Sequence, residues 1–258
     1  MQPIASKDND RLKEIRALRA GKGDKDVCLV EGPRLFTEAL DAGVDVQWAL
    51  YDPEDQKLAP LLDRASSSGV TLCPCKASLL REVSDVDSPR GFIAVASRPT
   101  SDLAPMGGTK GLIVVSAGIQ DPRNLGAIIR SAAGLGANGV VTLKGGVSAW
   151  HPRSVRGSAG MVFRVPVLDG ILPEEFFALA ESQGLEILAT GTAGIPLHKV
   201  ESRGPLALLL GEEGGGLDSV LRERCSQTIA IPLRRGVESL NVGAAAAVLV
   251  HALAPPPI

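Results

Sequence analysis

The sequence lacks long hydrophobic runs and an apolar leader segment. None of its 258 residues belongs to an apolar run near the ~18 residues that span a bilayer. The charged N-terminus MQPIASKDNDRLKEIRALRA contains no apolar signal-peptide core. We therefore expect no membrane partner and a cytoplasmic location.

Cysteine is scarce as well. Of the four cysteines, only Cys73 and Cys75 lie close together, and no second pair or histidine spacing completes a zinc site. We interpret the cysteines as free thiols of a reducing compartment and expect no metal.

The chain also lacks a strong net charge. Its formal net charge of −2 gives no sign of a nucleic-acid partner, but the local charge does. The stretch from Thr142 to Leu168 contains no acid, and the first turns of the chain are rich in basic residues. Either stretch alone is more often a solvated face, so the two together favour a polyanionic partner only modestly. The basic residues are Lys7, Arg11, Lys13, Arg16 and Arg19, followed later by Lys144, Arg153, Arg156 and Arg164.

Hydrophobic periodicity divides the chain into two α/β regions. Residues 1–100 alternate helical and strand-like segments, and 97–111 are rich in Pro, Gly, Ser and Thr, which predicts a linker at 101–110. Residues 111–258 open on GLIVVSAG, an apolar run typical of strands buried on both faces. Strands and helices then alternate, which predicts a parallel sheet covered on both sides.

One glycine pattern is misleading. The segment Gly134 to Gly139 matches the GxGxxG dinucleotide pattern, but it follows a helix and precedes a strand, the reverse of the required order. We interpret its glycines as a helix end and a turn.

Three strand-to-helix junctions of the second region are rich in Gly, Asn and charge. In the first, residues 117–132, we expect Asn124 to cap a helix, with Gly126 allowing a close approach to its first turn. Arg130 follows about 1.7 turns later and need not share the direction of the cap. For this segment alone, a capped helix with a surface arginine is an equally good interpretation.

The second junction, LGEEGGGL at 210–217, has three consecutive glycines. Their conformational entropy is costly, so they suit a backbone that reaches around a ligand, with a flexible turn as the alternative.

The third junction, IPLRRGVESLNVG at 231–243, ends in two possible helix caps. Ser239 and Asn241 can each cap, one cap suffices, and the other polar group is free to face a ligand. The small residues from Gly243 to Ala247 either favour the helix or let another backbone approach closely.

Together these junctions resemble the three motifs of the SpoU (TrmH-type) RNA 2′-O-ribose methyltransferases, of the SPOUT superfamily. NLGAIIRSA is similar to the first motif, LGEEGGGL to the second and IPLRRGVESLNVGAAAA to the third. RGSAGMVFRVPV at 156–167 resembles a segment between them. Glu212 and Gly243 depart from the residues usual at their positions. VCLVEGPRLFTEAL and SPRGFIAVA resemble the L30e-like substrate-binding domain that precedes many members, whereas 45–85 show only a generic α/β pattern.

The resemblance implies an α/β architecture: a smaller L30e-like RNA-binding domain over 1–100 and a catalytic domain over 111–258 whose parallel sheet contains a deep trefoil knot. It also implies a homodimer with sites at the subunit interface. The activity implied is methyl transfer from S-adenosylmethionine to a ribose 2′-hydroxyl of structured RNA, with ribosomal RNA favoured over transfer RNA.

The same resemblance transfers site residues to this chain. It implies that catalytic residues are Asn124, Arg130, Glu213, Ser239 and Asn241, and that the cofactor meets Leu210, Gly211, Gly214, Gly216, Ile231 and Leu240. We expect Arg34, Arg153 and Arg156 to contact RNA. Because a guanidinium is essentially never deprotonated, we expect Arg130 to hold a phosphate and stabilise the alkoxide rather than act as a base.

Two alternatives stay open at this point. One is a catalytically inactive RNA-binding paralogue with the same fold, which the retained motif residues disfavour. The other is a knotted enzyme that methylates a base, which the combination of Ser-Leu-Asn with Asn124 and Arg130 disfavours.

Overall fold

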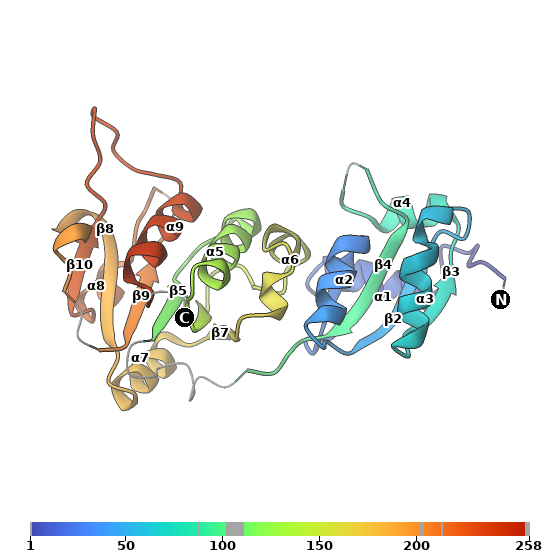
Figure 1. Cartoon of the computed structure of the whole chain (residues 1–258), viewed down its shortest axis with the longest axis horizontal. Helices are drawn as coiled ribbons and strands as arrows, with labels where there is room; N and C mark the ends of the chain where they lie inside the picture. Colours follow the sequence, from blue (N-terminus) through green and yellow to red (C-terminus); the bar gives the residue numbers. More distant parts are fainter. Residues whose placement is uncertain (1, 87, 102–110, 202–203, 213, 256–258) are drawn as a thin grey trace. The chain divides into compact units, whose positions relative to one another are not determined.

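The computed structural model describes residues 2–86, 88–101, 111–201, 204–212 and 214–255. It divides into two compact units. The first comprises Met1–Pro99 with Trp150–Arg156, and the second comprises Thr100–Ala149 with Gly157–Ile258. Figure 1 shows the elements of both units. Within the described ranges, no helix is both long enough and apolar enough to cross a bilayer.

The first unit is built on a four-stranded mixed sheet of order β1-β4-β2-β3. β4 pairs antiparallel with β1 and β2, and β3 pairs parallel with β2. Leu12, Ile15 and Leu18 of α1 recur at helical spacing and are buried against the sheet, as the sequence predicts. The elements are α1 (Asp10–Arg19), β1 (Val27–Glu31), α2 (Pro33–Asp41), β2 (Val46–Tyr51), η1 (Gln56–Leu58), α3 (Ala59–Ser67), β3 (Thr71–Pro74), α4 (Ala77–Val83) and β4 (Phe92–Ser97).

The second unit is built on a six-stranded sheet of order β10-β8-β9-β5-β6-β7, in which every neighbouring pair is parallel. This confirms the predicted α/β class with a parallel sheet. The elements are β5 (Leu112–Ser116), α5 (Pro122–Gly134), β6 (Gly139–Leu143), η2 (Met161–Phe163), β7 (Val167–Ile171), α7 (Pro173–Ser182), β8 (Glu186–Pro196), η3 (Leu197–Lys199), β9 (Leu206–Leu210), α8 (Ser219–Glu223), β10 (Gln227–Ala230) and α9 (Val242–Leu253). Helix α6 (Pro152–Gly157) follows β6 along the chain, and its residues up to Arg156 belong to the first unit.

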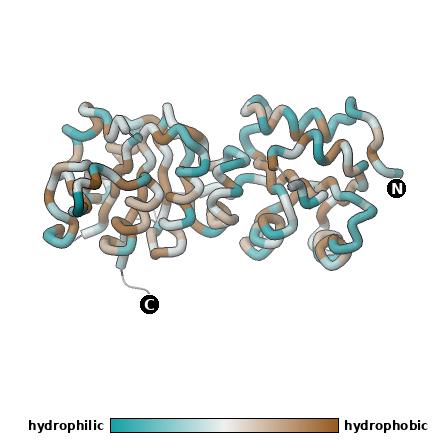
Figure 2. The backbone as a smooth tube through the Cα atoms, turned by 90° about the horizontal axis from the view of Figure 1, so that it is seen from above, coloured by the Kyte–Doolittle hydropathy of each residue, from teal (hydrophilic) through white to brown (hydrophobic). Residues whose placement is uncertain are grey.

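The central strands of this sheet are buried on both faces. Every residue of β5, β6 and β9 is buried, so the apolar run at 112–116 has the environment that its composition predicts. One face packs against α7, Leu221 of α8 and Cys225, which follows α8. On the other face, α9 packs against α5 and β5. Along the helices, the tube in Figure 2 alternates polar and apolar colours, as expected for helices with one buried side.

The GxGxxG-like segment lies where the sequence predicts. α5 ends at Gly134, Gly136 has a φ of 94°, and Gly139 begins β6. These glycines end a helix and form a turn, so they provide no dinucleotide-binding helix start.

Candidate cofactor and active site

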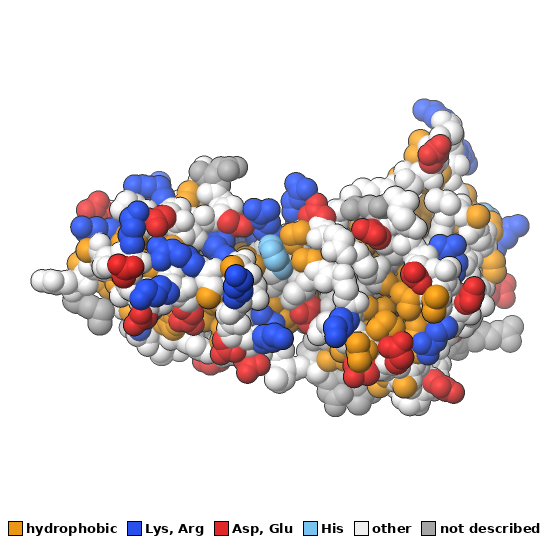
Figure 3. All heavy atoms as spheres, turned by 180° about the vertical axis from the view of Figure 1, so that it is seen from behind, with side chains coloured by type: hydrophobic (Ala, Val, Ile, Leu, Met, Phe, Trp, Pro, Cys, Tyr) orange, Lys and Arg blue, Asp and Glu red, His pale blue; other side chains and the backbone are white. Residues whose placement is uncertain are grey.

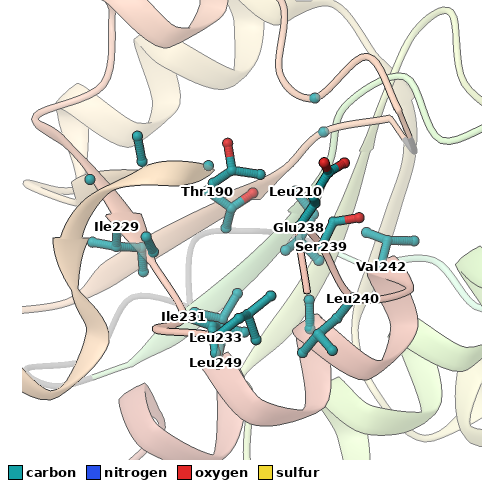
Figure 4. Close-up of a pocket in the computed structure, with 18 of the residues that line it drawn as sticks. Thr190, Leu210, Ile229, Ile231, Leu233, Glu238, Ser239, Leu240, Val242 and Leu249 are labelled. Carbon is teal, nitrogen blue, oxygen red and sulfur yellow. The ribbon is translucent and has the colours of Figure 1, made fainter. Parts of the chain in front are cut away.

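A cavity of about 1160 Å³ opens at the carboxyl ends of β8, β9 and β10, in the second unit. Ligands of open parallel sheets bind at this edge. α9 closes one side of the cavity through Val242, Ala245 and Leu249. Figure 4 shows Ile231, Leu233 and Leu249 grouped at one end of the space and Thr190 at the opposite end. The cavity thus combines apolar side chains with a few polar groups, as small-molecule sites do.

Backbone hydrogen bonds and close glycine contacts shape the junction after β9. The backbone N–H of Glu212 donates to the carbonyl of Gly216 at 2.9 Å, and Gly216 donates back to Glu212 at 2.8 Å. Gly214 and Gly216 have φ values of 81° and 69°, where side chains are strained. A Cβ on Gly211 would lie 2.3 Å from the backbone of Gly216 and Leu217. These three glycines are therefore required by the geometry of the loop.

The junction after β10 returns to the cavity before α9 begins. Asn241 is the N-cap of α9, and its side-chain oxygen accepts hydrogen bonds from the N–H groups of Gly243 at 3.0 Å and Ala244 at 3.4 Å. Ser239 is therefore the spare polar group that the sequence anticipates. Ser239 and Leu240 are exposed and line the cavity.

The expected capping role of Asn124 is wrong. α5 begins at Pro122, and the side chain of Asp121 caps it by accepting from the N–H of Arg123 at 2.8 Å. Proline is favoured in the first helical position, which makes the residue before it the cap. Asn124 instead lies in the first turn, and its side-chain oxygen accepts a hydrogen bond from Nδ2 of Asn241 at 3.0 Å. This hydrogen bond joins the junction after β5, which contains Asn124, to the junction after β10, which contains Asn241.

Close backbone approaches are also expected from the sequence at Gly126 and at the small residues that begin with Gly243, near the hydrogen bond between Asn124 and Asn241. A Cβ on Gly157 would lie 3.2 Å from Cα of Gly126, so Gly126 does receive a close neighbour. A Cβ on Gly243 would lie 3.0 Å from Cβ of Ala127. The start of α9 therefore approaches α5 at a distance that only small residues allow.

The structure brings together only part of the expected catalytic group. Asn124 and Asn241 are in contact, and Ser239 lies on the cavity wall. Arg130 is exposed on α5 and is not among the residues that line the cavity. Glu213 lies outside the described residues. All six residues expected to meet the cofactor are on the wall: Leu210, Gly211, Gly214, Gly216, Ile231 and Leu240.

One wall of the cavity is not predicted by the sequence motifs. β8 pairs with β10 in two segments. Thr228 of β10 pairs with Ala189 of β8, but the next residue, Ile229, pairs with Ile195, so the register shifts between them. The intervening residues 190–194 bulge toward the cavity and line it. The hydroxyl of Thr190 donates to the carbonyl of Leu209 at 2.9 Å, which ties this bulge to β9. The only signal in the sequence is the run of small residues TGTAG directly after an apolar strand.

The arginines expected to contact RNA differ in their surroundings. Arg34 is exposed on α2. In the first unit, Asp85 pairs with Arg156 at 2.7 Å and with Arg153 at 2.9 Å. Burial raises the pKa of Asp85, but hydrogen bonds from Arg156 and Arg153 outweigh burial and lower it to about 2. Both arginines thus already have an anionic partner.

The cysteines are all free thiols, and Cys28, Cys73 and Cys75 are buried. Burial raises the pKa of the Cys28 thiol to about 12 and that of Cys75 to about 11. Across the described ranges, no three His, Cys, Asp or Glu side chains gather as metal ligands.

Comparisons with known proteins cover both parts of the chain. Residues 111–251 match the model of the SpoU rRNA Methylase family, and residues 9–94 match that of the MRM3-like substrate binding domain. A similar curated protein is the 23S rRNA (guanosine(2553)-2′-O)-methyltransferase RlmP of Bacillus subtilis. It is 29% identical, and the alignment covers 98% of this chain and 99% of that protein.

Two solved structures extend this similarity to the fold. The SpoU methyltransferase AviRb from Streptomyces viridochromogenes, in complex with the cofactor AdoMet, has 28% identity and a TM-score of 0.83, covering 95% of this chain and 97% of that one. An RNA 2′-O ribose methyltransferase has 30% identity and a TM-score of 0.78, covering 98% of each chain.

Proposed function

Because the chain belongs to the SpoU rRNA methylase family, we propose that it transfers a methyl group from S-adenosylmethionine to a ribose 2′-hydroxyl of structured RNA. The observation that carries this proposal is the cavity at the carboxyl ends of β8, β9 and β10, whose walls contain two of the three motif-like junctions. Ribosomal RNA is the favoured substrate class over transfer RNA, because RlmP, similar along its whole length, is named for 23S rRNA.

The cavity fits S-adenosylmethionine in size and in chemistry. Its volume of about 1160 Å³ is sufficient for a ligand of that size. Ile231, Leu233 and Leu249 offer apolar contacts to a flat heterocycle. Gly211 and the glycines from Gly214 to Gly216 bring peptide groups to the wall, which suits hydrogen bonding to ring nitrogens and ribose hydroxyls. When bound, S-adenosylmethionine supplies an electrophilic methyl group.

The residues of the chain then act on the ribose. We assign Ser239 and Asn241 to positioning of the substrate phosphate or of Arg130, with Asn124 fixing the orientation of Asn241 through their hydrogen bond. Glu213 shapes the pocket in this proposal. Arg130 holds the adjoining phosphate through a two-pronged contact and stabilises negative charge on the 2′-oxygen. The proton of the hydroxyl leaves to phosphate or water, since a guanidinium does not accept it. Arg153, Arg156 and Arg34 contribute non-specific affinity for phosphate.

A homodimer would complete this arrangement. Arg130 is exposed on α5, outside the cavity wall, so a second copy of the chain could supply it across an interface. Val248 on α9 and Leu240 before it are 42% and 39% exposed, and such apolar side chains are suited to burial between subunits. The same proposal includes residues 1–100 as the RNA-binding domain, 111–258 as the catalytic domain and a knotted path for the chain that ends in α9. A cytoplasmic location fits an RNA substrate and free thiols.

The experiment that tests the activity uses total ribosomal RNA and transfer RNA incubated with labelled cofactor. We expect label in ribosomal RNA at a linkage that resists alkali, because a 2′-O-methyl group blocks cleavage through the 2′-hydroxyl. Label in alkali-sensitive linkages would instead indicate base methylation. Cofactor binding by calorimetry without label transfer to any RNA would favour the inactive RNA-binding paralogue.

A further inference from the structure

The segment between β10 and α9, residues 231–241, forms an arm that leaves the cavity and returns to it. Ile231 to Leu233 line the cavity at one end, and Val237 to Asn241 line it at the other. In Figure 1 this arm extends away from the sheet, and Figure 3 shows basic side chains at its tip. The residues at the tip are Arg234, Arg235 and Gly236, all exposed.

The turn at the tip has an unusual residue for its conformation. The N–H of Val237 donates to the carbonyl of Arg234 at 3.3 Å, which closes a four-residue turn. Both central residues have positive φ, 60° for Arg235 and 73° for Gly236. Turns of this kind favour Asn-Gly, Asp-Gly or Gly-Gly, because other side chains are strained there. Turn geometry therefore does not account for the arginine at 235.

The guanidinium groups at the tip differ from other arginines of the chain in their surroundings. Neither Arg234 nor Arg235 forms an ion pair with any residue that the structure describes, whereas Arg153 and Arg156 pair with Asp85. The one acid in the arm, Glu238, lines the cavity. Two consecutive arginines on an exposed turn, neither with an ion-pair partner among the described residues, offer guanidinium groups to oxygen anions.

We propose that Arg234 and Arg235 bind the phosphate backbone of the RNA strand beside the reacting ribose. This inference rests on the proposed function, because it assumes that RNA is the substrate. Ser239 follows Arg235 by four positions, so the tip lies within about 14 Å of the cavity wall. A phosphate bound at the tip therefore belongs to the same strand segment as the ribose that faces the cavity. The arm links RNA binding to the cofactor cavity because both of its ends form cavity walls.

The test compares three variants with the wild-type chain. Arg235→Gly removes the guanidinium but places in the turn a residue that its φ favours, so the arm keeps its shape. Arg234→Gln with Arg235→Gln removes both charges. Lys199→Gln is the control, since it removes one exposed charge from the same unit, outside the cavity. RNA affinity is measured by filter binding at several salt concentrations, cofactor affinity by calorimetry, and subunit association by sedimentation.

We expect Arg235→Gly to weaken RNA binding about threefold to tenfold and the double variant to weaken it further, with the salt slope reduced by about one for each arginine removed. Cofactor affinity and subunit association should stay as in the wild type, and Lys199→Gln should change RNA binding less than twofold. Wild-type RNA affinity in Arg235→Gly would overturn the proposal. Loss of subunit association in the double variant would also overturn it, because the arm would then bind a second copy of the chain.

The RNA-affinity test of the arm can fail or succeed separately from the methyl-transfer test of the proposed function. If the wild-type chain binds RNA but neither binds cofactor nor transfers methyl groups, the proposed function fails while the arm is still tested by RNA affinity. If methylation occurs and the arm variants bind RNA normally, the proposed function stands and the role of the arm is wrong.

Discussion

The side chain of Asn241 donates a hydrogen bond of 3.0 Å to the side-chain oxygen of Asn124, across 117 residues of sequence. The oxygen of the same Asn241 side chain caps α9. One amide thus holds the start of α9 and the first turn of α5 together, beside the cavity. The two roles use different atoms and can be separated by substitution.

Substitution of Asn241 should therefore have two distinct effects. Asn241→Ala removes both roles, and we expect it to lower the free energy of unfolding by about 1 kcal/mol, as lost N-caps do. Asn241→Asp keeps the capping oxygen and loses the donor, so stability should stay near wild type while methyl transfer falls. Denaturant titration and steady-state kinetics measure the two effects.

Asn9→Ala, which removes the corresponding cap of α1, is the control and should cost stability without changing cofactor affinity. Equal activity of Asn241→Asp and wild type would show that the contact with Asn124 has no role in catalysis.

The loop after β9 offers a matched pair of glycine substitutions. In Gly211→Ala, the new Cβ would meet backbone atoms at 2.3 Å, so the loop must open. We expect a loss of roughly 1–3 kcal/mol in stability and weaker cofactor binding. In Gly215→Ala, the nearest atom is the Glu212 carboxylate oxygen at 3.6 Å, an ordinary contact, so the change should be nearly neutral. Thermal melts with and without S-adenosylmethionine distinguish the two variants. Similar melts for both would mean that the loop can open without cost.

The small residues of α9 can be tested in the same way. Ala245 is half-buried on the cavity wall, whereas Ala244 is exposed one residue earlier. Ala245→Leu should weaken cofactor binding at least tenfold and cost about 1–3 kcal/mol by overpacking. Ala244→Leu should change neither quantity appreciably. Calorimetric titration with S-adenosylmethionine gives the comparison, and unchanged affinity in Ala245→Leu would mean that the cofactor does not approach this turn of α9.

The position of Arg130 outside the cavity predicts complementation between inactive chains. Arg130→Ala and Ser239→Ala should each lower kcat by about 100-fold or more. When the two variants are co-expressed, about a quarter of wild-type activity should return, since half of the dimers would be mixed and each mixed dimer would contain one complete site. A mixture of Ser239→Ala with Asn241→Ala serves as the control and should stay inactive, because both residues belong to the same chain's half of the site. No recovery in the first mixture would contradict a site shared between subunits.

The buried thiol of Cys28 predicts a decline of stability at alkaline pH. Burial raises its pKa from 9.0 to about 12 in the folded chain. The raised pKa means that the folded state holds the proton more tightly than the unfolded state. The stabilisation is therefore fully present below pH 9 and is lost as the pH rises toward 12, by up to about 1.4 kcal/mol per pH unit. Denaturant titration of the wild type and of Cys28→Ala between pH 8 and 10.5 measures this effect. A parallel pH dependence in both proteins would assign the decline to other groups.

The sequence predicts the fold more fully than it predicts the site. Apolar runs such as 112–116 identify buried strands because burial on both faces leaves no polar position. The N-cap of α5 was misplaced by three residues because both Asp121 and Asn124 are good caps, and only Pro122 decides between them.

The remaining site features depend on tertiary structure. The bulge at 190–194 arises from a register change against β10, which no local pattern encodes. The location of Arg130 depends on which face of α5 the rest of the chain covers. The motif positions therefore identify the residues to test, whereas the contact between Asn124 and Asn241 and the position of Arg130 outside the cavity wall arise only in the tertiary structure.

The participation of α9 in the cavity has a consequence for the order of events during synthesis. Strands β5, β6 and β9 can emerge and pair as the chain is made, but the wall formed by Val242, Ala245 and Leu249 is translated after β10. A nascent chain therefore has no complete cofactor pocket until Leu249 has left the ribosome. An intermediate in which residues 242–249 have not yet been translated would have the parallel sheet but not this wall of the cavity.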